Sequence, residues 1–202
     1  MAQTTKLFDG KTTTGWHSYL KTGPGAWKVV DGALQLDPKA EGQGDLVTDK
    51  EYENYELSVT WKIAEGGNSG IIFGIHEDPS FNETYLTGIE MQVLDDKKAS
   101  DNKKANHLAG SLYDLITPKN KVLKPVGEFN TARLLVDHGH VEQWVNGVKV
   151  VEYELNSKEI NDLISKSKYR TNPNFAKSTS GHIMFQHHGQ KVWLRNIKIK
   201  RL

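Results

Sequence analysis

The chain has 202 residues, a net charge of +1 from 26 basic and 25 acidic side chains, and no cysteine. The balanced, interspersed charges exclude the basic surface expected of a nucleic-acid-binding protein, and the absence of cysteine excludes a disulfide framework and a thiolate metal site. No apolar run is long enough to span a membrane, and the length suits one all-β unit, so we expect a single domain over residues 1–202.

The N-terminal segment, Met1–Lys6, lacks the apolar stretch of a signal peptide. Two locations are therefore open at this point. The chain is either cytoplasmic or the mature form of an exported protein whose signal has been removed.

The predicted elements, taken along the chain, are mostly short β-strands. Asp31-Gly32 separates two apolar runs and favours a type I′ hairpin, as does Asn146-Gly147 further on. Between them, Tyr55–Ile63 alternates strictly between apolar and polar residues, which predicts a strand with one buried face. Many such runs predict an all-β fold, an antiparallel β-sandwich with jelly-roll topology, in which the outer face of a concave sheet can hold a ligand.

One short surface helix is expected after these strands. Residues 156–164 begin with residue types suited to an N-cap and then place three apolar side chains at helical spacing. The charged segment 96–108 and the polar segment 166–180 show neither pattern. Loops of this length are usually lids over a site or surface insertions.

Two of the strand-like segments carry polar side chains at alternate positions. On the first, Glu90 and Gln92 share one face; on the second, Gln186 and His188 share a face, and alternation directs His187 to the opposite one. We expect the four side chains that share faces to form the floor of one site. The alternative is a solvated outer face with a structural histidine.

The segment Gly66–Gly70 places Asn68 among three glycines, which favours either a turn or a close backbone approach at the start of a strand. Among the tryptophans, Trp61 is in register with apolar residues and is expected in the core. Trp16 and Trp27 are candidates for the rim of a sugar site, where an aromatic ring can stack on the sugar.

A series of short motifs occurs in order along nearly the whole chain. These are Leu7–Lys11, Gly15-Trp16, Trp27–Leu34, Tyr55–Leu57, Gly67–Ile71, Gly88–Asp95, Gly110–Tyr113, Gly127–Asn130, Asn146-Gly147 and Gly181–Leu202. Together they resemble the 3-keto-disaccharide hydrolase family, whose fold is similar to that of the concanavalin-A-like lectins and glucanases. The resemblance implies a carbohydrate substrate, namely a glycoside already oxidised to a ketone at sugar C3. It also implies a bacterial, extracytoplasmic protein, periplasmic or secreted, with the cytoplasm as the alternative.

One position departs from the pattern of that family. The family usually has Gln-Asp-His-Gly where this chain has Gln186-His187-His188-Gly189. Because alternation directs His187 away from the expected site, we predict that the change has little effect on the chemistry. The role of the missing aspartate stays open.

The implied chemistry is removal of the C2 proton, which the C3 ketone acidifies, then expulsion of the aglycone and addition of water. As hypotheses, Glu90 and His188 act as base and acid, and Tyr113 is a further proton donor. The candidates for substrate binding are Asn68, Gln92, Gln186, Arg195, Trp16 and Trp27, with Arg195 stabilising oxyanion charge. A divalent metal ion held by Glu90 and His188 is an alternative electrophile, although two ligands are too few to define its site.

Two other classes of protein stay open at this stage. A non-catalytic carbohydrate-binding module can have the same sandwich fold. A conventional glycosidase requires two carboxylates across the scissile bond, and the strand that carries Glu90 lacks the paired acidic arrangement of laminarinase-like glucanases.

Overall fold

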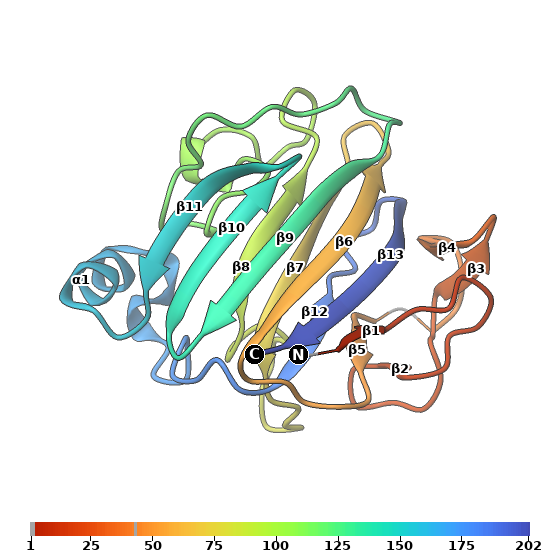
Figure 1. Ribbon diagram of the computed structural model, residues 1–202, viewed down its shortest axis with the longest axis horizontal. Coiled ribbons are helices and arrows are strands. Elements are labelled where there is room, and N and C mark those ends of the chain that lie inside the picture. Colours follow the sequence, from red (N-terminus) through yellow and green to blue (C-terminus); the bar gives the residue numbers. More distant parts are fainter. Residues whose placement is uncertain (1–2, 43) are drawn as a thin grey trace.

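The computed structural model describes residues 3–42 and 44–202. Within these residues the chain forms two antiparallel β-sheets that pack face to face, and a single α-helix lies beside one edge (Figure 1). The β-sandwich predicted from the strand pattern is confirmed. None of the helices in this described part is long and apolar enough to cross a membrane.

The larger sheet has eight strands among the described residues, in the order β11-β10-β9-β6-β13-β4-β3, with β1 paired to β13. They are β1 (Thr4–Lys6), β3 (Trp27–Val30), β4 (Ala33–Leu36), β6 (Tyr55–Ile63), β9 (Asn130–Asp137), β10 (His140–Val145), β11 (Val148–Glu154) and β13 (Val192–Arg201).

The smaller sheet has five strands in the described residues, in the order β2-β5-β12-β7-β8. They are β2 (Trp16–Ser18), β5 (Leu46–Thr48), β7 (Asn68–Ile75), β8 (Ile89–Leu94) and β12 (His182–Phe185). The sequence neighbours β7 and β8 pair directly, and β12 joins them from the far end of the chain. This topology places the two segments with alternate polar side chains on either side of β7.

The core lies between the sheets and follows from the alternation of apolar residues. In β6 the odd-numbered residues from Tyr55 to Ile63 are buried and the even-numbered ones are half-buried. Trp61 is 2% exposed, so its predicted place in the core is confirmed. In β8, Ile89, Met91 and Val93 join this core, which leaves the even-numbered residues of that strand for the outer face.

The two predicted hairpins and the predicted helix are present. Asp31 and Gly32 have φ angles of 50° and 73°, and Asn146 and Gly147 have φ angles of 47° and 80°, as a type I′ turn requires. Helix α1 (Lys158–Lys166) is capped by the Ser157 side chain, which accepts a hydrogen bond from the backbone N–H of Ile160. Segments 96–108 and 166–180 are mostly irregular, apart from the short 3₁₀ turns η1 (Ala105–His107) and η2 (Lys168–Thr171).

Candidate active site

A hollow lies on the outer face of the smaller sheet, across β12, β7 and β8. Gly70 on β7 stands opposite Gln92 on β8, and its carbonyl accepts a hydrogen bond of 3.1 Å from the backbone N–H of Gln186. The row across the three strands therefore reads Gln92, Gly70, Gln186. Because Gly70 has no side chain, the middle of this row leaves space for a side chain from a neighbouring strand.

The carboxyl group of Glu90 occupies the space that Gly70 leaves. A Cβ atom added at Gly70 would lie 2.2 Å from Oε1 of Glu90, far inside van der Waals contact. The glycine-rich segment predicts a turn or a close backbone approach; at Gly70 the absence of a side chain instead accommodates the carboxyl group of Glu90.

Loops complete the walls of a pocket of about 310 Å³ over this floor. Asp101 comes from segment 96–108, Lys168 comes from segment 166–180, and Tyr113 comes from the stretch that bonds to the outer edge of β8. The full lining consists of Asp45, Asn68, Glu83, Thr84, Tyr85, Glu90, Gln92, Asp101, Tyr113, Lys168, Gln186, His187 and His188. Six of the nine residues proposed from the sequence therefore lie in one pocket: Asn68, Glu90, Gln92, Tyr113, Gln186 and His188.

Glu90 is the most perturbed carboxyl group of the pocket. Burial raises its pKa to about 8 from an ordinary value of 4.5; Asp45 and Asp101 add to the rise, and the Lys168 ammonium opposes it. The carboxyl forms no hydrogen bond or ion pair within residues 3–42 and 44–202. A carboxyl group with a pKa near neutrality, free of partners and facing a cavity, is suited to taking up or giving a proton.

Three buried polar atoms of the pocket lining also lack partners in the described part of the chain. They are Oδ1 of Asn68, Nε2 of Gln92 and Nε2 of His187. A buried polar group without a hydrogen bond is costly, so such groups usually await a ligand or water. An assembly of unpaired donors and acceptors suits a ligand with many hydroxyl groups, each of which both donates and accepts.

The prediction that His187 points away from the site is wrong. Strand β12 ends at Phe185, so the alternation stops before the two histidines, and both of them line the pocket. The backbone N–H of Gly189 donates to Nδ1 of His187 over 3.3 Å. In the neutral ring this places the proton on Nε2, where it is an unpaired donor.

Asp45 explains why the chain departs from the strand direction at this point. Its Oδ1 accepts a hydrogen bond of 2.5 Å from the backbone N–H of His187, and its Oδ2 accepts one from the Thr84 hydroxyl. Burial raises the pKa of Asp45, although these hydrogen bonds oppose the rise. No sequence pattern distinguished Asp45, which lies just before the short strand β5.

Tyr113 has its hydroxyl engaged by another residue. The hydroxyl donates to Oδ2 of Asp101 over 2.7 Å, and Oδ1 of Asp101 lies 2.7 Å from Nδ1 of His107. Burial and this carboxylate raise the pKa of Tyr113 above its ordinary value. The structure therefore makes Tyr113 a weaker acid than a free tyrosine.

Comparison with known proteins identifies the family. Residues 3–200 match the model of the 3-keto-alpha-glucoside-1,2-lyase-like domain. The chain is 34% identical over 224 residues to a 3-keto-disaccharide hydrolase of Bacteroides thetaiotaomicron, an alignment that covers 97% of this chain and 77% of that protein. The chain belongs to this family. The resemblance inferred from the ordered motifs is confirmed, and the relationship supports a hydrolase that acts on carbohydrate.

Solved structures agree with the family assignment and the fold. A candidate glycosyl hydrolase of Parabacteroides distasonis superposes with a TM-score of 0.89 at 32% identity, covering 98% of this chain and 94% of that one. An endo-beta-1,3(4)-glucanase of family GH16 superposes with a TM-score of 0.53 at 12% identity, covering 98% and 88% of the two chains. The second likeness concerns the fold alone and agrees with the predicted jelly roll.

His187, which stands where the family usually has an aspartate, lies in the pocket and not on the opposite face of the sheet as predicted. Position 187 faces the pocket, so the histidine here replaces a carboxylate with an N–H donor inside the site. The prediction that this change is remote from the chemistry rested on strand alternation, and it fails because β12 ends at Phe185.

Three of the residues proposed for substrate binding, Trp16, Trp27 and Arg195, lie outside the pocket over β8. Trp16 is 4% exposed and stacks on Phe185 with ring centroids 5.1 Å apart, and Trp27 is 1% exposed in the core. Each indole N–H donates to a backbone carbonyl, that of Leu7 for Trp16 and that of Gly44 for Trp27. Both tryptophans are therefore core residues and not rim residues.

Arg195 is separated from the pocket by the topology. It lies on β13 in the larger sheet, and its guanidinium packs over the Phe129 ring at 3.6 Å from the centroid. The pocket belongs to the outer face of the smaller sheet, so Arg195 cannot contact a ligand bound there.

The pocket residues do not fit a divalent metal ion. Among the described residues, a group of three ligand atoms close enough to share an ion occurs only at His140, Glu142 and Glu152, on β10 and β11 of the larger sheet. There Lys149 already pairs with both glutamates, at 3.3 Å and 2.7 Å. In the described part of the chain, Glu90 and His188 belong to no such group of three ligand atoms.

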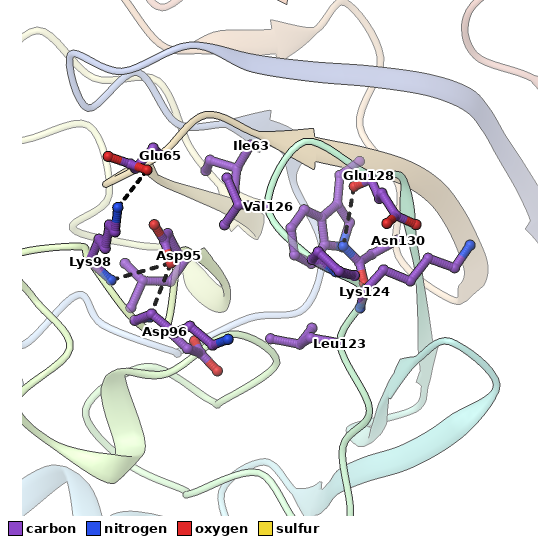
Figure 2. Close-up of a pocket in the computed structure, with 14 residues that line it drawn as sticks. Ile63, Glu65, Asp95, Asp96, Lys98, Leu123, Lys124, Val126, Glu128 and Asn130 are labelled. Atoms are coloured by element: carbon purple, nitrogen blue, oxygen red, sulfur yellow. Dashed lines mark hydrogen bonds and ion pairs between the residues drawn. The ribbon is translucent and has the colours of Figure 1, made fainter.

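A second pocket of about 310 Å³ lies at one end of the sandwich (Figure 2). Several of its charged groups have partners: Lys98 pairs with Glu65 at 2.7 Å, and Asp95 accepts the backbone N–H groups of Gly66, Lys97 and Lys98. The pocket also holds none of the residues proposed from the sequence. The buried carboxyl group with a raised pKa and most of the residues proposed from the sequence lie in the pocket over β8.

Proposed function

We propose that this protein cleaves glycosides oxidised to a ketone at sugar C3, by elimination followed by hydration, with Glu90 as the base. The observation that carries the proposal is a buried, unpaired carboxyl group with a pKa of about 8, set among unpaired hydrogen-bonding groups. A base of this strength is matched to a C2 proton that a neighbouring ketone has acidified. The family relationship supports a substrate of this class.

The proposed reaction proceeds in two balanced steps. Glu90 takes the C2 proton, and the electrons of the C2–H bond move into an enolate whose charge rests on the C3 oxygen. The enolate then re-forms the ketone and expels the aglycone from C1; the aglycone oxygen takes a proton and a C1–C2 double bond remains. Addition of water across that double bond gives the free 3-keto sugar, so the net result is hydrolysis.

We assign the protonation of the leaving group to His188. Its ring is exposed at the pocket and forms no hydrogen bond within the described residues, so it can exchange protons with solvent. The Tyr113 hydroxyl is a poorer choice because it already donates a hydrogen bond to Asp101. Asn68, Gln92 and Gln186 then bind sugar hydroxyls on the floor, and His187 contributes its Nε2–H.

Cleavage in D₂O tests this reaction. We expect the protein to release the aglycone from a 3-keto glucoside and not from the unoxidised parent, and we expect deuterium at C2 of the released sugar. Elimination removes the C2 proton and hydration returns one from solvent, whereas direct displacement at C1 leaves that proton in place. The label is read by mass spectrometry and NMR.

Two controls make the labelling decisive. The free 3-keto sugar is incubated with and without protein to measure exchange that does not require a leaving group. Equal cleavage of oxidised and unoxidised glycosides would contradict the mechanism. Accumulation of an unsaturated sugar would show that this protein performs the elimination and leaves hydration to another catalyst.

Gly70→Ala should reduce kcat/KM about 10²-fold while the protein stays folded, because the new methyl group displaces the Glu90 carboxyl by an ångström or more. Gly88→Ala is the matched control, since its Cβ meets Ile72 and Ile75 instead of a pocket residue. Both variants are compared by circular dichroism and by turnover of the 3-keto glucoside. Equal losses in the two variants would mean that crowding of the sheet, and not displacement of Glu90, causes the effect.

A further inference from the structure

Lys168 contributes an ammonium group to the pocket that the sequence patterns did not indicate. Its Nζ lies over three tyrosine rings, at 4.4 Å from the centroid of Tyr113, 4.9 Å from Tyr85 and 5.0 Å from Tyr169. Each ring presents its negative face to the cation. The three rings hold the charged end of a flexible side chain at one place on the pocket wall.

The backbone of Lys168 is fixed independently of its side chain. Its N–H donates to Oδ2 of Asp114 over 2.9 Å, and Oδ1 of Asp114 lies 2.8 Å from Nε2 of His107. The preceding residue, Ser167, closes helix α1 by donating from its hydroxyl to the carbonyl of Ile164. Helix α1 and the Asp114–His107 pair therefore fix the backbone position from which the Lys168 side chain extends.

The amine of Lys168 has no carboxylate partner among residues 3–42 and 44–202, although Glu90, Asp45, Asp101 and Glu83 all line the same pocket. An ammonium that lies over aromatic rings without an ion pair keeps its N–H groups available for a ligand. Its positive charge also lowers the pKa of Glu90, against the effect of burial.

We propose that Lys168 is a catalytic residue whose ammonium group binds the C3 oxygen of the substrate and stabilises the charge that forms there when Glu90 removes the C2 proton. The inference rests on the function proposed above. No proton leaves Lys168: its N–H···O contact strengthens as the C3 oxygen becomes negative and weakens again when the ketone re-forms. In this role the amine acts as a hydrogen-bond donor and does not add to the ketone to form an imine.

Three variants test whether the Lys168 ammonium stabilises the charge on the C3 oxygen or acts only through the net charge. They are Lys168→Met, Lys168→Arg and the control Lys166→Met. We expect Lys168→Met to lower kcat for the 3-keto glucoside by about 10²–10³-fold with a small change in KM, as for loss of one oxyanion donor. Lys168→Arg should recover part of that loss. Lys166 has no ring contact and lies in the last turn of α1, so its substitution should leave kcat unchanged.

A second measurement needs no substrate. In protein labelled with ¹³C at glutamate carboxyl carbons, the titration midpoint of Glu90 should move upward in Lys168→Met and stay in place in Lys166→Met. Loss of activity without that movement would point to a structural effect and overturn the proposal. Wild-type kcat in Lys168→Met would overturn it as well, and so would a sugar adduct on Lys168 after borohydride reduction, because that would make the amine a nucleophile.

The two proposals fail in distinguishable ways. If the wild-type protein does not release the aglycone from a 3-keto glucoside, the proposed function is wrong, whatever Lys168 does. If the wild-type protein cleaves it with deuterium at C2, and Lys168→Met does so at the same rate, only the role of Lys168 is wrong.

Discussion

Glu90→Gln should lower kcat/KM for a 3-keto glucoside by about 10²–10⁴-fold, because the amide has nearly the shape of the carboxyl group but cannot accept the C2 proton. In the wild-type protein kcat/KM should rise about tenfold per pH unit and level off above about 8, since the base must be ionised and its pKa is about 8. Steady-state rates across pH 5–10 measure both effects.

Glu56→Gln provides the matched control for this substitution. Glu56 lies on β6 of the larger sheet, where its carboxylate accepts a hydrogen bond of 2.7 Å from Arg133, and it is absent from the pocket. Both variants replace a carboxyl group by an amide of nearly the same shape, and only the loss of Glu90 should abolish the pH-dependent rise. Full activity in Glu90→Gln, with the fold intact, would exclude Glu90 as the base.

The same Glu90→Gln substitution should make the protein more stable at neutral and alkaline pH. The pKa of Glu90 is raised from 4.5 to about 8 in the folded protein, so the folded state holds a proton that the unfolded state releases. The stability associated with this group is complete below pH 4.5 and is lost progressively as the pH rises to about 8. Glutamine avoids that loss, and we expect a gain on the order of 1–3 kcal/mol at pH 7.

Thermal unfolding of the two proteins as a function of pH measures this gain. For a chain of this size, 1 kcal/mol corresponds to roughly 2–4 °C in Tm, so the difference should be several degrees at pH 8 and small at pH 4.5. Glu56→Gln should change Tm little at any pH, because its ion pair lies at the surface. A Glu90→Gln variant that is less stable than the wild type at pH 8 would mean that the buried carboxylate is stabilised by a group not identified as its partner.

These opposite effects on rate and stability have one physical cause. A carboxyl group held in a poorly solvated hollow is a stronger base than usual because its ionised form is costly, and the same cost weakens the folded state. The glycine at position 70, and the unpaired Oδ1 of Asn68 and Nε2 of Gln92, are further places where the sheet leaves space or hydrogen-bonding capacity for a ligand.

Much of the fold was predictable because its determinants are local. Alternation along Tyr55–Ile63 identifies a strand with one buried face, and β6 has those bounds. Positive φ angles at Asn146 and Gly147 follow from the residue types that tolerate them. The shared face of Glu90 and Gln92 likewise follows from the two-residue period of a strand, and the structure adds Asn68, Gln186 and His188 to the same pocket.

The wrong predictions apply a local rule, such as the alternation of side chains along a strand, beyond the residues where it holds. His187 was directed outward on the assumption that β12 continues, but the chain leaves the sheet after Phe185 and Asp45 binds the backbone of His187. Trp16 and Trp27 are rim candidates on the sequence alone because an aromatic ring can stack on a sugar. The packing of the two sheets buries both rings instead.

The sequence by itself determined the two-sheet architecture, the family and the alternate polar side chains of β8. These properties depend on periodicity and on residue types within a few positions of one another. Only the tertiary structure decided which loops close over the sheet and thereby bring Asp45, Asp101 and Lys168 to Glu90. That choice depends on contacts between segments distant in the chain, such as Asp114 with the backbone of Lys168, which no local pattern encodes.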